Sequence, residues 1–217
     1  MQNSVNHFSL AEEILHAITH GIGFLLSIAG LVLLIVAASA GGHAIAITSA
    51  SVYGATLMLM YGSSTLYHAL PHTGIKRLFQ KFDHSAIYFL IAGTYTPVML
   101  VSVGGAAGWT IFGIEWGIAL AGIALKFLFP GRLETLSLIA YIVMGWMIVA
   151  VFDTFVHHID PVGLWLMVAG GIAYTGGVIF YVKDNITYFH TIWHLFVIAG
   201  SALHFFAILF YVLPVKG

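Results

Sequence analysis

The stretch SAIYFLIAGTYTPVMLVSVGGAAGWTIFGIEWGIALAGIALKFLF, from Ser85 to Phe129, is almost continuously apolar. A helix needs about 20 mostly apolar residues to cross the hydrocarbon core of a bilayer, so this stretch is too long for one crossing, even a tilted one. Gly104, Gly105 and Gly108 lie near its middle and mark a tight turn. The stretch therefore predicts two consecutive transmembrane helices, and it indicates an all-α membrane protein.

Five further apolar stretches meet the same length criterion, so we expect a bundle of seven transmembrane helices that forms a single domain over residues 1–217. Most connections between these stretches are short. The polar segment from His68 to His84 is the exception, and we expect it to form a longer loop. The predicted spans cover approximately residues 13–40, 44–68, 84–104, 108–129, 133–153, 161–182 and 190–213.

The composition agrees with a chain that is embedded in lipid. Of the 217 residues, 60% are hydrophobic and 7% are charged, whereas a soluble domain carries about 25% charged residues. The formal net charge is −1 and there is no long basic tract, which argues against nucleic acid as a partner. Cysteine is absent, so any metal must be held by nitrogen or oxygen atoms, and the chain offers 12 histidines.

The basic residues predict an orientation. With seven spans, all the lysines and arginines except Lys216 fall on the side of the N-terminus. Cytoplasmic loops of membrane proteins carry an excess of such residues, so we expect the N-terminus in the cytoplasm and the C-terminus outside. The basic residues on the expected cytoplasmic side are Lys76, Arg77, Lys81, Lys126, Arg132 and Lys183.

Ionisable and polar side chains gather near the expected cytoplasmic end of four spans. Ionisable groups at membrane depth are costly unless they are paired, liganded or hydrated, so each is a candidate for a functional site. Chain positions as distant as 13 and 194 are expected at one depth in the membrane. The group consists of Glu13, His16, His20, Ser63, Ser64, His68, Asp83, His84, His190 and His194.

Part of this group has the spacing of a metal site. His190 and His194 are four residues apart and share one helix face, which suits two imidazoles on one ion. His68 would complete a three-histidine site with an open fourth position, as in catalytic zinc sites, and Asp83 could hydrogen-bond a water there or orient a ligand ring. The alternative is that these histidines are interfacial side chains with an apolar body and a wet edge.

The first span carries a second pattern, Glu-x-x-His-x-x-x-His, formed by Glu13, His16 and His20. This pattern could ligate a metal itself. We favour a supporting role, in which these side chains and His84 pack against the three-histidine site and supply hydrogen bonds to it. A carboxylate at the start of a helix also complements the helix dipole, which is the alternative role for Glu13.

Other ionisable residues are left without a functional role. Glu115 and His204 lie inside predicted spans, and we expect His204 to hydrogen-bond another helix. The outer segment with Asp153, His157, His158 and Asp160 could bind a metal, but we favour a solvated turn.

Five short motifs carry a family resemblance: AEEILHAITHGIG at 11–23, STLYH at 64–68, FDHSAIY at 82–88, IAGTYTP at 91–97 and HTIWH at 190–194. Together they resemble the bacterial haemolysin III branch of the progestin and adipoQ receptor family, within a wider superfamily that includes alkaline ceramidases. The resemblance runs from about residue 9 to the C-terminus.

The resemblance implies seven helices with the N-terminus inside, a location in the bacterial inner membrane, and a zinc ion near the cytoplasmic face. It implies that His68, His190 and His194 are the zinc ligands. It also implies that Asp83 holds a water on the zinc and that Ser64 lies beside the site.

Three functions follow as hypotheses. The first is a zinc-dependent lipid amide hydrolase in membrane lipid homeostasis, with Asp83 as general base and Ser64 on the oxyanion, acting on a lipid with an acyl chain. The second is a non-enzymatic membrane-state sensor with structural zinc. The third is a cytolytic pore former, which we disfavour because a secreted toxin must first be soluble. The predicted orientation is inverted for a G-protein-coupled receptor, so no G protein is expected as a partner.

Overall fold

The computed structural model describes residues 8–71 and 74–214, and these residues form helices joined by short turns. Seven helical segments within these ranges are long and apolar enough to cross a membrane, which confirms the predicted helix bundle. The elements are α1 (Leu10–Ala40), α2 (Ala44–Ala69), α3 (Gly74–Pro97), η1 (Val98–Val103), α4 (Gly105–Leu128), α5 (Glu134–Gly145), η2 (Met147–Val151), α6 (Phe152–His158), α7 (Pro161–Val182), α8 (Phe189–Ala207) and η3 (Ile208–Val212).

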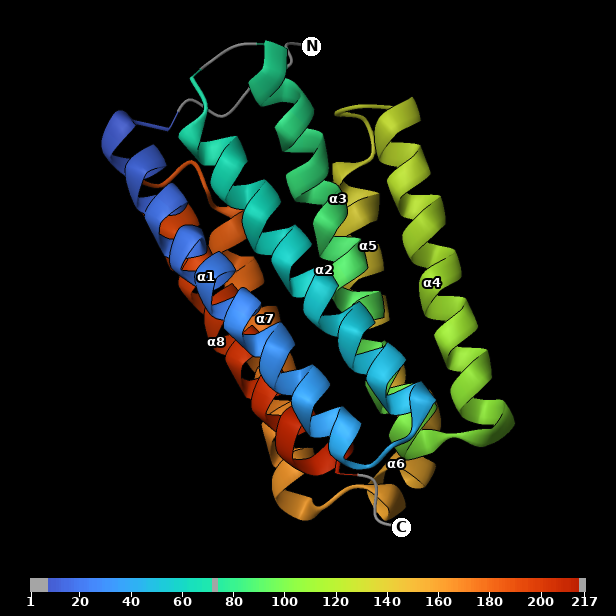
Figure 1. The fold of residues 1–217 in the computed structure, drawn as a ribbon. Coiled ribbons are helices and arrows are strands. Elements are labelled where there is room, and N and C mark those ends of the chain that lie inside the picture. The colour runs from blue at the N-terminus through green and yellow to red at the C-terminus, as the bar shows by residue number, and fades with distance from the viewer. Residues whose placement is uncertain (1–7, 72–73, 215–217) are drawn as a thin grey trace.

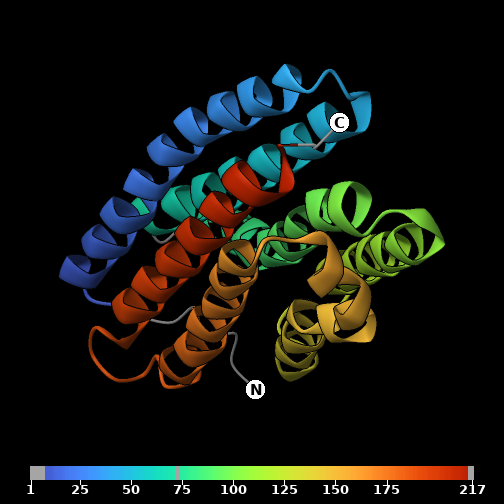
Figure 2. The ribbon, with the colours of Figure 1, turned by 90° about the horizontal axis from the view of Figure 1, so that it is seen from below.

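The long helices run side by side in an elongated bundle (Figure 1). Seen along the bundle, α1 and α8 lie next to each other, and α7 follows α8 on the other side (Figure 2). The helix α2 packs against α1 and α3, while α4 lies at the outer edge against α3. Because successive helices alternate in direction, the start of α1, the end of α2 and the starts of α3 and α8 meet at one end of the bundle.

The start of α1 is held by a capping box and by a tie to α8. The Ser9 hydroxyl accepts a hydrogen bond from the backbone N–H of Glu12 at 3.3 Å, and the Ser9 N–H donates to the Glu12 carboxylate at 3.0 Å. The other oxygen of Glu12 accepts from the backbone N–H of Tyr188 at 2.9 Å, immediately before α8. These bonds fix the first turn of α1, which carries Glu13, against the start of α8.

The third span differs from the prediction. The segment before His84 is helical, because α3 begins at Gly74, so the expected long loop from His68 to His84 was wrong. Apolar residues recur at helical spacing in this segment, at Ile75, Leu78 and Phe82. This is the pattern of an amphipathic helix, which a search for continuously apolar stretches does not detect because the segment also contains many polar residues. Lys76, which was assigned to the loop, is buried within the bundle.

The basic residues that predicted the orientation lie at the end of the bundle where α1 begins, in or next to the ends of α3, α4 and α7. Lys216, the one expected on the opposite side, lies outside the described residues. The structure thus agrees with a charge difference between the two ends. The direction of the bundle in the membrane stays a prediction.

The fifth span is broken inside the bundle, where α5 ends at Gly145 and a short 3₁₀ segment leads into α6. A break at membrane depth frees backbone groups that lipid cannot satisfy. Tyr95 of α3 satisfies two of them: its hydroxyl donates to the Gly145 carbonyl at 3.1 Å and accepts from the Ile148 N–H at 2.8 Å. The broken span is thereby tied to α3.

Candidate metal site

Four histidine rings meet at the end of the bundle where α1 begins. His16 comes from α1, His68 from α2, and His190 and His194 from the first turns of α8. Their ring centroids lie between 4.6 and 5.4 Å from one another, and all four side chains are buried. Ligand atoms of His16, His68 and His190 fall within 4.8 Å of one another, so this buried group could hold a metal ion.

Ring nitrogens of these histidines are buried without hydrogen-bond partners among the described residues. They are both nitrogens of His16, Nε2 of His68 and Nδ1 of His190. A buried polar atom without a partner is costly, and nearly all such atoms in folded proteins are satisfied. Several of them lying close together fit the donor set of a metal that imidazole nitrogen binds, such as zinc.

The orientation of His68 is set by a buried carboxylate. Its Nδ1–H donates to Glu13 Oε2 at 2.8 Å, and Glu13 Oε1 accepts from the Lys76 ammonium at 2.7 Å. A carboxylate that holds one nitrogen of an imidazole leaves the other as a lone-pair donor, as in the carboxylate–histidine pairs of metal sites. Glu13 therefore leaves Nε2 of His68 available inside the cluster.

A threonine on α1 orients His194 in the same way. The Thr19 hydroxyl donates its only hydrogen to the Leu15 or His16 carbonyl, at 2.8 and 3.0 Å. Its oxygen lies 3.2 Å from Nδ1 of His194, so that nitrogen carries the hydrogen and donates to Thr19. In this assignment, Nε2 of His194 carries the lone pair that could bind a metal ion.

His20 lies beside the cluster in a different arrangement. Its ring stacks on that of His194 with centroids 3.5 Å apart and an angle of 7° between the planes. Its Nδ1 lies 2.7 Å from the Ser64 hydroxyl. His20 thus links the histidine cluster to Ser64, in agreement with a supporting position.

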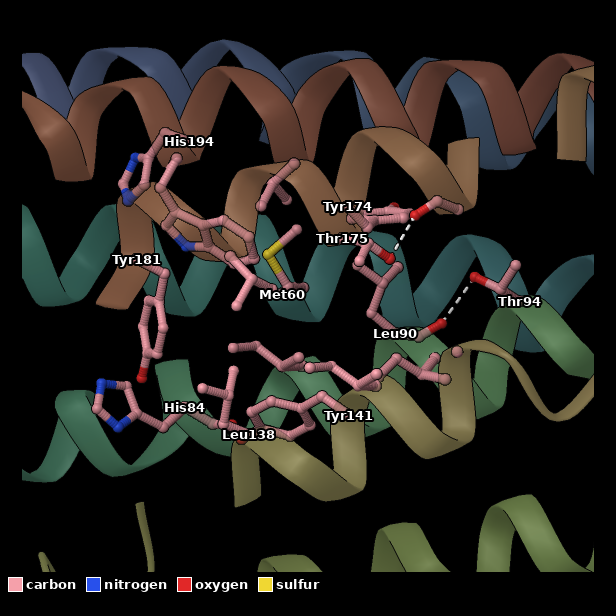
Figure 3. Close-up of a pocket in the computed structure, with 18 of the residues that line it drawn as sticks. Met60, His84, Leu90, Thr94, Leu138, Tyr141, Tyr174, Thr175, Tyr181 and His194 are labelled. Carbon is pink, nitrogen blue, oxygen red and sulfur yellow. Dashed lines mark hydrogen bonds between the residues drawn. The ribbon is translucent and has the colours of Figure 1, made fainter. Parts of the chain in front are cut away.

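A cavity of about 120 Å³ opens from the cluster into the bundle. Ser64 and Asp83 line it together with His190 and His194, and the contact of Ser64 with His20 places Ser64 at the end near the cluster. Figure 3 shows His84 and His194 on two sides of that end, with Thr94 and Tyr174 farther along the cavity. Most of the remaining lining is apolar, so the cavity offers a polar head and an apolar interior; its apolar side chains include Met60, Ile87, Leu90, Ile91, Leu138 and Val197.

His84 lies next to a carboxylate on α5. Its Nδ1 lies 3.5 Å from the Glu134 carboxylate, which also accepts a hydrogen bond from Lys126 at 2.6 Å. His84 also lines the cavity, so it is near the site but pairs with a different group. These contacts join α3, α4 and α5 at the end of the bundle that holds the cluster.

The structure brings the predicted histidines of three spans together, and it places two further residues, Lys76 and Thr19, in contact with this group. Lys76 was placed in a loop, although its position beside apolar residues at helical spacing could have indicated a helix start. Thr19 was not considered, although it lies between His16 and His20 on the same span. His16 was expected to support the site, and the structure places its ring among the other three.

The remaining ionisable residues lie away from this cluster. Nε2 of His204 lies 2.9 Å from the Met167 carbonyl on α7, which confirms the expected bond to another helix. His157 is exposed, as expected, but it lies in the helix α6, where it contacts the Asp153 carbonyl, and not in a turn. Glu115 is fully buried, and its carboxylate has no hydrogen-bond partner within the part of the chain that the structure describes.

A bundle of seven membrane-length helices with a buried histidine cluster at one end defines a multi-pass membrane protein with an internal site able to hold a metal ion. Comparison with known families is specific: the family model described as Haemolysin-III related matches residues 8–205. The chain belongs to this family, as the motifs indicated.

Individual relatives agree with this assignment. The chain is 47% identical over 203 residues to Hemolysin-3 of Bacillus cereus, covering 94% of this chain and 93% of the relative. It is 45% identical over 208 residues to the Hemolysin-3 homolog of Bacillus subtilis (strain 168), covering 96% and 98%. It is also 31% identical over 166 residues to the human Monocyte to macrophage differentiation factor, covering 74% and 68%.

Proposed function

We propose that this protein is a zinc-dependent hydrolase that cleaves an amide bond in a membrane lipid, and that it serves lipid homeostasis in the bacterial cytoplasmic membrane. One observation carries the proposal: buried imidazole nitrogens without partners lie at the head of an apolar cavity that Asp83 and Ser64 also line. Metal donors, a carboxylate, a hydroxyl and an apolar chamber are the parts that such a reaction requires.

His68, His190 and His194 would hold the ion. A bound zinc ion would supply a Lewis acid that polarises a carbonyl group and makes a water molecule more acidic. Asp83 would take a proton from the attacking water and deliver it to the nitrogen of the leaving amine, while the Ser64 hydroxyl would donate to the developing oxyanion. Addition of water and cleavage of the C–N bond would release a fatty acid and an amine.

The substrate class follows from the chemistry of the cavity. Ser64 and Asp83 line it together with His190 and His194, and most of its other lining side chains are apolar and come from several helices. An acyl chain would fit this lining, with the amide group at the cluster and the polar head toward the end of the bundle where α1 begins. If the N-terminus is cytoplasmic, the head group would be approached from the cytoplasm.

The decisive test has two stages. The full-length protein is purified in mild detergent, loaded with zinc and washed, and its zinc content is compared with that of a His190→Ala, His194→Ala double variant. Near-stoichiometric zinc that is lost in the double variant supports the site. The loaded protein is then incubated with ceramides and other N-acyl lipids, and fatty acid release is measured by mass spectrometry.

Asp83→Asn is the matched control for the second stage, because it keeps the histidines and removes the proposed base. Release of fatty acid by the wild type and its loss in Asp83→Asn, with zinc retained, is the expected result. A protein that binds zinc but releases no fatty acid from the whole panel, neither as the wild type nor as His16→Asn, in which one ring of the cluster is removed, would rule out the amide hydrolase.

The second candidate is a membrane-state sensor in which the ion only joins helices. It is favoured by the origin of the four rings, which come from α1, α2 and α8. A sensor should keep its cellular activity in Asp83→Ala while an enzyme should not. The pore former suggested by the relatives' names would instead show a size cutoff when haemolysis is protected by polymers of graded size.

A further inference from the structure

We propose that His16 is a fourth ligand of the metal, so that four imidazoles from three helices enclose the ion in this protein. The inference rests on the proposed metal site and goes beyond its three-histidine ligand set. It assigns a role to α1, which otherwise supplies only residues that support the site.

The spacing of the four rings carries the proposal. All six centroid distances among His16, His68, His190 and His194 lie between 4.6 and 5.4 Å, so the rings stand at the corners of a nearly regular tetrahedron. A tetrahedron with edges of about 5 Å has its centre about 3 Å from each corner. Zinc about 2.0–2.1 Å from an imidazole nitrogen lies roughly 3.2 Å from the ring centroid, so the size of the cluster matches four zinc-bound rings.

The orientations of the rings agree with this geometry. The angles between the four ring planes lie between 48° and 67°, so no two of these rings are stacked. Rings that point one nitrogen each at a common centre are tilted against one another in this way. Tetrahedral coordination by four protein ligands is also the geometry that zinc adopts in closed sites.

Within the part of the chain that the structure describes, no hydrogen-bond partner of His16 explains its position. Its side chain is fully buried, and neither ring nitrogen has a hydrogen-bond partner among the described residues. Among the described residues, its ring contacts are with Phe8 and with the three other imidazoles of the cluster. A histidine buried only for packing would leave two polar atoms unsatisfied, and coordination would satisfy one of them.

His20 is the other histidine that α1 could offer, and the geometry argues against it. Its ring lies parallel to that of His194 at 3.5 Å, so the two rings cannot both direct a nitrogen at one ion. Its Nδ1 already contacts Ser64. Glu13 is also committed elsewhere, because its two oxygens bond His68 and Lys76.

A fourth imidazole has a functional consequence for the proposed hydrolase. Four protein ligands leave a tetrahedral zinc with no open position for water, which is the difference between structural and catalytic sites. His16 must therefore leave before hydrolysis can begin. Because α1 packs mainly on α2 and α8, a movement of α1 relative to these two helices would carry His16 away from the ion.

X-ray absorption at the zinc edge tests the ligand set directly. The full-length protein with one equivalent of zinc should show four imidazoles and no oxygen ligand. His16→Asn should show three imidazoles and one oxygen, and His20→Asn, the matched control on the same helix, should keep four. A wild-type spectrum with three imidazoles and an oxygen, unchanged by His16→Asn, would overturn the proposal.

Zinc release provides a second readout that does not depend on counting ligands. Loss of an outer partner of a metal ligand typically weakens binding 10–100-fold, so loss of a direct ligand should accelerate zinc transfer to a chelator by at least about tenfold. His16→Asn and His16→Gln should both show this acceleration, and His20→Asn should not. Equal release rates for the wild type and both His16 variants would also overturn the proposal.

Failure of this inference and failure of the hydrolase are distinguishable. Four imidazoles without fatty acid release, even in His16→Asn, would support His16 as a ligand and reject the hydrolase. Three imidazoles together with fatty acid release would reject His16 and support the hydrolase. Faster fatty acid release by His16→Asn than by the wild type is the expected result if both hold, and a protein that takes up no zinc would reject both.

Discussion

Glu13 on α1 accepts a hydrogen bond from Nδ1 of His68 on α2 at 2.8 Å, and this contact joins the first turn of α1 to the histidine cluster. Both side chains are buried, and the second oxygen of the carboxylate bonds Lys76 of α3. Three helices thus meet around one carboxylate. The contact also decides which nitrogen of His68 faces the cluster, because the nitrogen bonded to Glu13 carries the hydrogen.

Glu13→Gln should weaken zinc binding by about 10–100-fold, because the carboxylate that orients His68 and raises its basicity is lost. Competition with a fluorescent zinc chelator measures the change. Glu12→Gln is the matched control, since Glu12 bonds Ser9 and Tyr188 rather than a cluster histidine. Unchanged zinc affinity in Glu13→Gln would show that His68 is not a ligand oriented by this contact.

Lys76→Met should destabilise the protein, because it leaves the buried Glu13 carboxylate without this cation. Removing one partner of a buried ion pair costs about 3–5 kcal/mol of the free energy of unfolding. The double variant Lys76→Met, Glu13→Gln should recover much of that loss. Thermal unfolding of the metal-free protein in detergent measures all four members of the cycle, and additive losses would show that the pair is not coupled.

Tyr95→Phe should destabilise the break in the fifth span. The hydroxyl satisfies one carbonyl and one N–H at this break, and leaving buried polar groups unsatisfied costs about 1–3 kcal/mol. Tyr211→Phe removes a hydroxyl that has no hydrogen bond within residues 8–71 and 74–214, and it should be nearly neutral. A shift in melting temperature for Tyr95→Phe no larger than that of the control would contradict this role.

The orientation can be measured with single cysteines, because the chain contains none. Arg132 lies between α4 and α5, and His157 lies on α6 at the opposite end of the bundle. With a cytoplasmic N-terminus, a membrane-impermeant maleimide should label His157→Cys but not Arg132→Cys in intact spheroplasts. Both should react after detergent is added. The reverse labelling pattern would mean that the bundle is inverted.

Much of the fold was predictable because a bilayer constrains sequence strongly. A spanning helix must be long and apolar, so the apolar stretches could be counted without knowing how the helices pack. The same criterion failed at residues 74–83, where α3 extends into a polar segment. There, the buried Lys76 contacts Glu13 from another helix. The hydropathy of the neighbouring residues does not predict such a contact, because the partner is distant in the sequence.

The candidate site was predictable to the same degree. The spacing of His190 and His194 places them on one face of a helix whatever surrounds it, and alternation of the spans brings His68 to the same depth. The sequence by itself therefore determined which helix ends meet and which histidines share a level, because both follow from helix geometry and membrane thickness.

Only the tertiary structure decided which face of α1 turns toward the cluster. His16 joins the other rings while His20 stacks beside them, and this depends on the rotation of α1 against α2 and α8. That rotation is set by close packing: a side chain at Gly23 would lie 2.5 Å from the Tyr61 ring, and one at Gly54 would lie 2.5 Å from Leu31. Such fits depend on the shapes of two surfaces together, so no single helix sequence contains them.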